Sequence, residues 1–207
     1  MHGSEHELRA SALACRRGGR ELFHGIGFTL RPGQWLHVRG ANGAGKTSLL
    51  RILAGLSVPH AGRLEWGGVE LRRARDDYRD ALAWLGHRGG LKEELSALDN
   101  LLVAAALDGH PLRADGARAA LARVGLRGRE SLPLRALSQG QRRRALMARV
   151  LARGARLWIL DEPLAALDAH GIDMVAGLLE EHLDRGGSAV LSSHQPLGLG
   201  GGLSVEL

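Results

Sequence analysis

The alternation of hydrophobic and polar positions in the first third of the chain predicts short strands and one helix. Residues 21–40 show apolar alternations broken by glycine and proline, which favours strands joined by a turn, with one strand at 35–38. Residues 47–54 carry leucines at helical spacing, which indicates an amphipathic helix. The stretch 62–71 is typical of a β-hairpin, because glycines separate two short apolar runs.

The rest of the chain changes between helical and strand periods. From about residue 86 to residue 152 the apolar pattern is helical, with breaks at Pro111 and Pro133. Residues 156–163 form an apolar run that ends in two carboxylates, which predicts a buried strand. Three further elements follow, namely an amphipathic helix over 173–187, a strand over 188–196 and a candidate last strand over 202–207. Strands that alternate with helices predict an α/β fold with a parallel core.

Length and composition fit one globular unit over residues 1–207. The chain is 44% hydrophobic, which is enough to bury a sizeable core. The net charge of +6 is compatible with nucleic acid, an anionic membrane surface or a phosphorylated ligand. Of the 28 basic residues only Lys46 and Lys92 are lysines, so arginine is the background cation of this chain. Cys15 is the only cysteine, which excludes an intrachain disulfide and points to a reducing compartment.

Residues 40–47 match the pattern G-x-x-x-x-G-K-[ST], between a predicted strand and a predicted helix. Glycines let successive backbone N–H groups turn toward phosphate oxygens, and the helix start adds its dipole. Lys46 is expected to reach the β- and γ-phosphates of ATP, and the Thr47 hydroxyl to bind Mg²⁺. A plain glycine-rich turn is the alternative in a chain with 30 glycines, but a rare lysine at this position favours phosphate binding. The predicted nucleotide-binding residues here are Gly40, Ala41, Asn42, Gly43, Ala44, Gly45, Lys46, Thr47 and Ser48.

Two carboxylates end the predicted strand at 157–162. In α/β sheets ligands bind beyond the carboxyl ends of the strands, so these side chains are expected beside the 40–47 loop. Asp161 is the expected Mg²⁺ residue, acting through water, and Glu162 the general base toward the attacking water. Without the loop, two solvated carboxylates at a strand end would be the simpler interpretation.

Three more segments narrow the class of ATPase. The sequence LSQGQ at 137–141 resembles the LSGGQ signature of ABC-type ATPases, and it precedes the 157–162 strand at the spacing of that family. The sequence LAALD at 164–168 resembles the D-loop, and His194 resembles the switch histidine. With the loop at 40–47 and the carboxylates at 161–162, the chain therefore resembles the ATP-binding cassettes of ABC transporters from Gly40 to His194.

The resemblance implies a fold and a division of the chain. It implies a P-loop NTPase core of the RecA-like type, with an antiparallel β subdomain and an inserted α-helical subdomain that carries the signature. The core with its β subdomain would occupy about 1–85 and 155–207, and the helical subdomain about 86–154.

The resemblance also implies a shared active site. Two copies would pair head to tail with two ATP molecules between them, each on the 40–47 loop of one copy and under the signature of the other. Ser138, Gly140 and Gln141 would then face the γ-phosphate on the opposing copy. His194 would contact the γ-phosphate as a catalytic residue, and Asp168 would cross the interface.

Residues 85–101, together with LWILDEP, SSHQPL and the short length, resemble the ATP-binding subunit of the cytochrome c maturation exporter. That resemblance implies a hydrophobic membrane permease subunit (CcmB type) as partner, with further cytochrome c maturation proteins and a link to haem export. It places the chain at the cytoplasmic face of the bacterial inner membrane as a peripheral protein. His87 would lie in the loop facing the membrane partner. The alternative is the ATP-binding subunit of another small-molecule ABC transporter.

Two positions depart from the family pattern. A glutamine that contacts Mg²⁺ and the attacking water in ABC cassettes aligns with Arg88, and arginine has donors but no acceptor. Arg88 is expected to turn toward the membrane partner or to contact the γ-phosphate. The aromatic residue that stacks on adenine aligns with Arg17 or a neighbour, and a guanidinium can stack on a base in its place.

Two rival classes remain. The arginines at 142–144 would suit a protein that binds nucleic acid, including a non-transport ABC ATPase, but in a chain with 26 arginines they do not require it. A P-loop kinase or GTPase is the second rival, and the signature, His194 and the lack of an N-K-x-D sequence argue against it. No nucleic-acid partner is expected.

Overall fold

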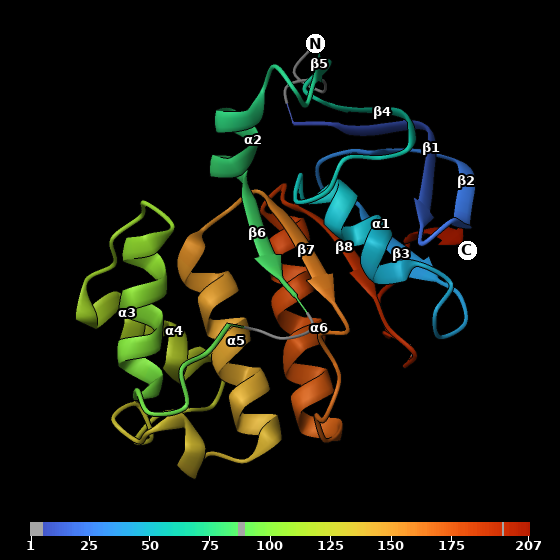
Figure 1. The fold of residues 1–207 in the computed structure, drawn as a ribbon. Coiled ribbons are helices and arrows are strands. Elements are labelled where there is room, and N and C mark those ends of the chain that lie inside the picture. The colour runs from blue at the N-terminus through green and yellow to red at the C-terminus, as the bar shows by residue number, and fades with distance from the viewer. Residues whose placement is uncertain (1–5, 87–89, 196) are drawn as a thin grey trace.

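The computed structural model describes residues 6–86, 90–195 and 197–207 and has the predicted α/β architecture, built on two sheets (Figure 1). The parallel sheet has the order β6 (Leu82–Leu85), β7 (Leu157–Asp161), β8 (Ser188–Ser192), β3 (Trp35–Arg39) and β9 (Leu203–Glu206). The antiparallel sheet has the order β2 (Arg20–Leu30), β1 (Leu8–Arg17), β4 (Ala61–Trp66) and β5 (Val69–Glu70).

The central strands of the parallel sheet are buried on both faces. Along β7, Ile159 packs into the apolar layer shared with the antiparallel sheet, while Trp158 and Leu160 pack against helices on the other face. Every residue of β7 and β8 is buried. A strand covered on both faces needs a continuous apolar run rather than an alternating one, which is the pattern of residues 157–160.

Helix α1 (Lys46–Leu53) fills the space between the two sheets. Leu49, Leu50 and Leu53 are fully buried, and they share one apolar cluster with residues of β1 and of the parallel sheet. Cys15 of β1 lies in the same layer with 6% of its surface exposed. The helix that follows the phosphate loop is therefore packed on two sides, which fixes where its first turn lies.

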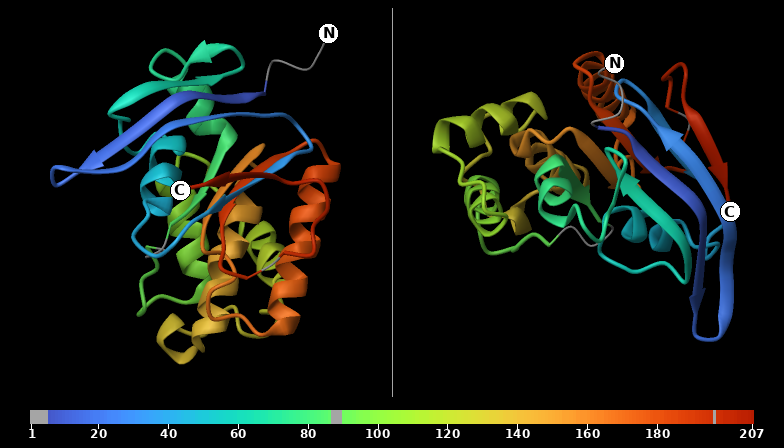
Figure 2. Two further views of the ribbon diagram at one scale, coloured as in Figure 1. Left: turned by 90° about the vertical axis from the view of Figure 1, so that its right-hand side faces the viewer. Right: turned by 90° about the horizontal axis from the view of Figure 1, so that it is seen from above.

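Helices cover the other face of the parallel sheet. Helices α5 (Gln139–Arg153) and α6 (Ala169–Asp184) pack on it, and α3 (Ala97–Leu107) and α4 (Ala114–Arg123) pack on α5, farther from the sheet (Figures 1 and 2). A 3₁₀ turn at Leu134–Ala136 precedes α5. Among the helices described here, none is both long enough and apolar enough to cross a membrane.

The structure confirms the hairpin of β4 and β5 and adds elements that the pattern did not predict. The additions are β1, the short helix α2 (Arg75–Ala81) and β6. Helix α6 starts at Ala169, earlier than the predicted residue 173, because Asp168 caps it. The division into a core with a β subdomain and a helical subdomain at about residues 86–154 stays a prediction.

Candidate functional site

The predicted site residues gather at one edge of the parallel sheet. Strand β8 lies between β7 and β3, and all three run in the same direction. Their carboxyl ends therefore meet, which is where α/β sheets place ligands. The 40–45 loop follows β3, Glu162 follows β7, and His194 lies two residues after β8.

The 40–45 loop has the backbone shape that glycine permits. Gly40, Gly43 and Gly45 have φ values of 141°, 83° and 111°, which other residues rarely adopt. A Cβ at Gly40 would also come within 3.0 Å of the carbonyl oxygen of Leu207. Helix α1 starts after Gly45 without a side-chain cap and without an acidic residue in its first turn. Its first N–H groups and its dipole are therefore free to bind an anion.

Lys46 is held inside this loop. Its Nζ donates hydrogen bonds to the carbonyl oxygens of Gly40 (2.7 Å) and Ala41 (3.2 Å), and it lies 3.4 Å from Nε2 of His194. Only 9% of the lysine surface is exposed. The ammonium group is thus placed over the loop, where phosphate oxygens would replace its carbonyl partners. The other predicted loop residues are exposed (Ala41, Asn42, Gly43, Thr47) or half-buried (Gly40, Ala44, Gly45, Ser48).

The two predicted metal residues are in direct contact. The Thr47 hydroxyl donates to Oδ2 of Asp161 at 2.9 Å, and the Ser192 hydroxyl donates to Oδ1 of the same carboxylate at 3.0 Å. Asp161 is 1% exposed, and the described residues contain no cluster of three or more His, Cys, Asp or Glu side chains suited to a metal. One hydroxyl and one carboxylate fit Mg²⁺, which keeps several waters and takes further oxygens from a bound nucleotide.

Glu162 adopts an unusual backbone conformation at the end of β7. Its φ is 52°, in the left-handed region, and its N–H donates to the Ser192 hydroxyl at 3.0 Å. Its Oε1 is buried, has no hydrogen-bond partner in the described part of the chain, and lies 3.5 Å from Nε2 of His194. A carboxylate oxygen left without a donor beside the phosphate loop is available to a water molecule or a ligand.

The LSQGQ segment begins helix α5. Ser138 is exposed, and its hydroxyl accepts a hydrogen bond from the N–H of Gln141 (3.2 Å), while the Gln141 side chain accepts from the N–H of Ser138 (3.0 Å). This is a capping box, so Gln141 stabilises the helix start within its own chain. A Cβ at Gly140 would lie 2.9 Å from the carbonyl oxygen of Ala166. Figure 1 shows this helix start well apart from the loop that precedes α1.

Asp168 caps helix α6. Its Oδ1 accepts from the N–H of Gly171 (2.8 Å) and from Nη2 of Arg144 (2.9 Å), although 71% of the side chain is exposed. The hydrogen bond from the Gly171 N–H and the Arg144 guanidinium lower the pKa of this carboxyl below its usual value. The contact of Asp168 with a second copy stays a prediction.

Other predicted residues are placed as follows. His87 and Arg88 lie outside the described residues. Arg17 is exposed at the end of β1, paired in register with Arg20 of β2. Ser192, which joins Asp161 to the N–H of Glu162, was not predicted as a site residue, and its position at a strand end beside the carboxylates is the signal that could have found it.

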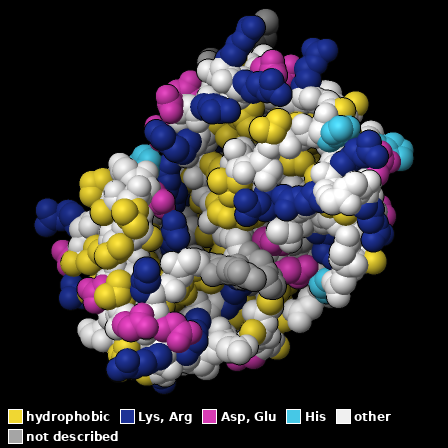
Figure 3. All heavy atoms as spheres, viewed as in Figure 1, with side chains coloured by type: hydrophobic (Ala, Val, Ile, Leu, Met, Phe, Trp, Pro, Cys, Tyr) yellow, Lys and Arg dark blue, Asp and Glu magenta, His cyan; other side chains and the backbone are white. Residues whose placement is uncertain are grey.

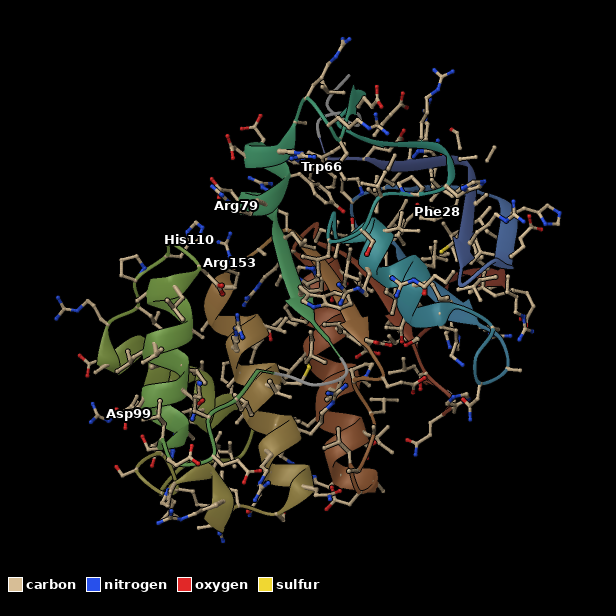
Figure 4. All side chains as sticks on the ribbon, in the orientation of Figure 1. Phe28, Trp66, Arg79, Asp99, His110 and Arg153 are labelled. Carbon is tan, nitrogen blue, oxygen red and sulfur yellow. The ribbon has the colours of Figure 1, made fainter. Side chains whose placement is uncertain are left out.

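A groove of about 900 Å³ lies on another face, among the ends of α1, α3 and α5 and helix α2. It contains exposed apolar residues (Leu56, Val58, Leu107), arginines (Arg63, Arg72, Arg75, Arg79, Arg149, Arg153) and acidic residues (Glu70, Asp76, Asp108). Figure 3 shows hydrophobic side chains next to basic ones on this face. At its rim Arg153 donates to the carbonyl oxygen of Arg79 at 3.0 Å, which joins α5 to α2 (Figure 4).

Comparison with known proteins gives consistent matches. The family model described as ABC transporter matches residues 23–165. A cytochrome c biogenesis ATP-binding export protein CcmA from Methylococcus capsulatus is 52% identical over 200 residues, covering 96% of each chain. Proteins of the same name from Nitrosomonas europaea and Escherichia coli K12 are 48% and 45% identical, covering 92% of this chain and 89% and 90% of their own.

Solved structures agree in fold. A protein from Pyrococcus furiosus, assigned as an ABC transporter ATP-binding protein, superimposes with a TM-score of 0.84 at 25% identity, covering 97% of both chains. A dimeric ATP-binding cassette in a post-hydrolysis state with ADP and phosphate superimposes with a TM-score of 0.80 at 20% identity, covering 91% of this chain and 88% of its own.

Proposed function

This chain belongs to the ABC transporter family, and we propose that its ATPase site energises export for cytochrome c biogenesis. As an ABC-type ATPase it binds ATP and hydrolyses it to ADP and phosphate, coupled to transport. The observation that carries the residue assignment is the meeting of Lys46, the Thr47–Asp161 pair and Glu162 at one sheet edge.

Each residue has a distinct proposed task. The N–H groups of the 40–45 loop and of the start of α1 bind the phosphates, and Lys46 neutralises the β- and γ-phosphate charge. Thr47 would hold Mg²⁺ directly and Asp161 through water, and the bound ion supplies charge neutralisation at the phosphates. Glu162 takes a proton from the attacking water, and His194 contacts the γ-phosphate from the end of β8.

We further propose that a second copy completes the site. Ser138 and the start of α5 present a hydroxyl, the N–H groups of Gln139 and Gly140, which the capping box does not use, and a positive helix end. They lie apart from the phosphate loop of the same chain. A head-to-tail pair would bring this helix start to the γ-phosphate held by the other copy, and Asp168 close to the interface.

We propose a membrane permease as the transport partner, of the CcmB type by the resemblance to the cytochrome c exporter, with the groove as its contact surface. The groove combines exposed apolar residues with arginines, three of which pair with acidic residues of the groove itself (Arg72 with Glu70, Arg79 with Asp76, Arg149 with Asp108). An apolar face rimmed by charges suits an amphipathic helical segment from the cytoplasmic side of a membrane protein. On this proposal the chain is a peripheral protein at the cytoplasmic face of the inner membrane, and the system handles haem. The alternative is export of another small molecule through a different permease.

The assignment of the base is tested with Glu162→Gln. The amide keeps the shape of the side chain but cannot accept a proton, so hydrolysis should fall at least about 100-fold. ATP affinity should stay within about twofold, and the variant should accumulate as an ATP-bound dimer in size-exclusion chromatography. Hydrolysis at the wild-type rate would refute the role of Glu162.

The partner is tested by purifying the tagged chain from its native membranes. A polytopic membrane protein should co-purify with the wild type and should be lost from Val58→Asp, which places a carboxylate in the apolar part of the groove. Val69→Asp is the matched control, because Val69 is exposed but does not line the groove. Co-purified cytochrome c maturation proteins would support the haem assignment, and an unrelated permease would support the alternative.

A further inference from the structure

We propose that Arg143 is a positioning residue that holds Glu162 in its working conformation and connects it to the start of helix α5. The inference rests on the proposed role of Glu162 as the general base. Arg143 itself would touch neither ATP nor the attacking water.

The contacts of Arg143 are with the backbone at the end of β7. Its Nη2 donates to the carbonyl oxygens of Asp161 (2.6 Å) and Glu162, and its Nε donates to that of Pro163 at 3.3 Å. Only 8% of the residue is exposed. A guanidinium has five N–H donors in one plane, so a single side chain can bind three successive carbonyl groups.

The backbone at Glu162 needs such support. A φ of 52° is sterically unfavourable for a residue with a Cβ, and it persists only where surrounding contacts hold it. Arg143 binds the carbonyl groups before, at and after this residue, and the Ser192 hydroxyl accepts from its N–H. The turn is therefore held from two sides, and its conformation sets the direction of the Glu162 side chain.

Burial of this guanidinium is costly, which argues against a role in packing alone. Desolvation lowers the pKa of Arg143, and the nearby charges of Asp161 and Glu162 oppose the shift. An apolar side chain of similar volume would fill the same space without that cost. An apolar residue could not make the hydrogen bonds to the backbone of residues 161–163, so we attribute the role of Arg143 to these bonds.

Arg143 also connects two functions that the proposed dimer divides between copies. It lies five residues after Ser138, the N-cap of the same helix, and the backbone hydrogen bonds of the helix join the two positions. Ser138 would meet the ATP of the second copy, whereas Glu162 would act on the ATP of its own chain. A shift of α5 when the dimer closes would therefore reach the Glu162 turn through Arg143.

The test compares Arg143→Met and Arg143→Lys with Arg123→Met. Methionine removes every donor, and lysine keeps the charge but not the planar set of donors. We expect kcat to fall at least about 30-fold in Arg143→Met and less in Arg143→Lys, with KM for ATP and nucleotide affinity within about twofold of wild type. Arg123 pairs with Glu181 between α4 and α6, and its loss should change kcat less than about twofold.

A double variant separates positioning from general damage. If Arg143 acts through Glu162, adding Arg143→Met to Glu162→Gln should leave the residual hydrolysis rate unchanged, because the base is already absent. A further fall as large as in the wild-type background would overturn the inference, as would wild-type kcat in Arg143→Met. If thermal melting shows that Arg143→Met does not fold, Arg143→Lys replaces it, both alone and combined with Glu162→Gln. If Glu162→Gln alone hydrolyses ATP at the wild-type rate, the assignment of Glu162 as the base is wrong. That result would refute the proposed function of Glu162 rather than the contacts of Arg143.

Discussion

At the scale of single residues, three adjacent arginines have three different surroundings. Arg142 donates to carbonyl oxygens of the 134–137 turn and to Glu93, Arg143 binds the end of β7, and Arg144 binds Asp168. A run that suggests a polyanion-binding helix in the sequence is therefore engaged in contacts within the chain. Each arginine joins α5 to a different neighbour.

Lys46 gives the sharpest prediction at this scale. Replacing it with alanine removes the charge-assisted contacts to the phosphates, each of which contributes about 1.5–3 kcal/mol. Lys46→Ala should therefore weaken ATP binding at least about tenfold, measured by titration with a fluorescent ATP analogue. Lys92→Ala is the matched control, because it removes the chain's other lysine, which is exposed. Equal loss of affinity in both variants would contradict the assignment.

The sequence predicted which residues meet at the sheet edge, but not the residues that support them. Lys46, Thr47 and Asp161 follow from a loop motif and a strand end, and the structure brings them together as expected. Arg143 could not be predicted, because its partners lie 18 to 20 residues away in the chain. The partners of Ser192 lie 30 to 31 residues away, and only its position at a strand end points to it. Which of 26 arginines turns inward is decided by tertiary packing, and no local pattern records it.

At the scale of elements, the cap of α6 predicts a pH dependence. The folded chain lowers the pKa of Asp168, so the unfolded chain binds more protons in the acid range, and the contribution of this group to stability is lost as pH falls. An asparagine at this position would still cap the helix but would carry no charge. Asp168→Asn should therefore lower the free energy of unfolding at pH 7, and the difference should shrink below about pH 4, the ordinary pKa range of aspartate.

Urea unfolding between pH 7 and pH 3 measures this difference. Asp115→Asn serves as control for the loss of one negative charge, because Asp115 is an exposed carboxylate in the first turn of α4. A stability difference for Asp168→Asn that stays constant down to pH 3 would show that the charge of the cap contributes nothing.

Local periodicity predicted most of the elements, but it missed β1, α2 and β6. Helix α2 has seven residues, of which only Tyr78 is buried. It is held by the hydrogen bond from the Tyr78 hydroxyl to the Leu53 carbonyl and by a T-shaped contact between the Tyr78 and Trp66 rings. Strand β6 has four residues that continue an apolar pattern and are strand only because β7 pairs with them. Both depend on partners distant in sequence, which local periodicity cannot report.

At the scale of the whole molecule, the proposed head-to-tail pair predicts complementation between inactive variants. Lys46→Ala disables the phosphate loop, and Ser138→Arg places a bulky cation where the other copy's γ-phosphate would lie. A mixed dimer would combine both defects in one site and leave the second site intact. Mixing the two proteins should therefore restore ATPase activity to about a quarter of wild type, if half of the dimers are mixed and the sites act independently.

The control mixture uses Lys46→Ala with Glu162→Gln. Both residues serve the same copy's ATP, so every site in a mixed dimer carries one defect, and activity should stay absent. The shared site would be excluded if ATPase activity returned in this control mixture. It would also be excluded if no activity returned in the mixture of Lys46→Ala with Ser138→Arg.

Because Cys15 is buried between the sheets, the opening and closing of the proposed dimer can be observed with site-specific probes. Its thiol is the only one in the chain and is shielded from solvent, so a cysteine introduced on the surface would be the single accessible point of attachment for a probe. Spin labels or fluorophores at one such position, for example on α5 near the LSQGQ segment, would report the separation between two copies without altering the native thiol. The opening and closing of the pair through an ATP cycle could then be followed in solution on a chain changed at one site.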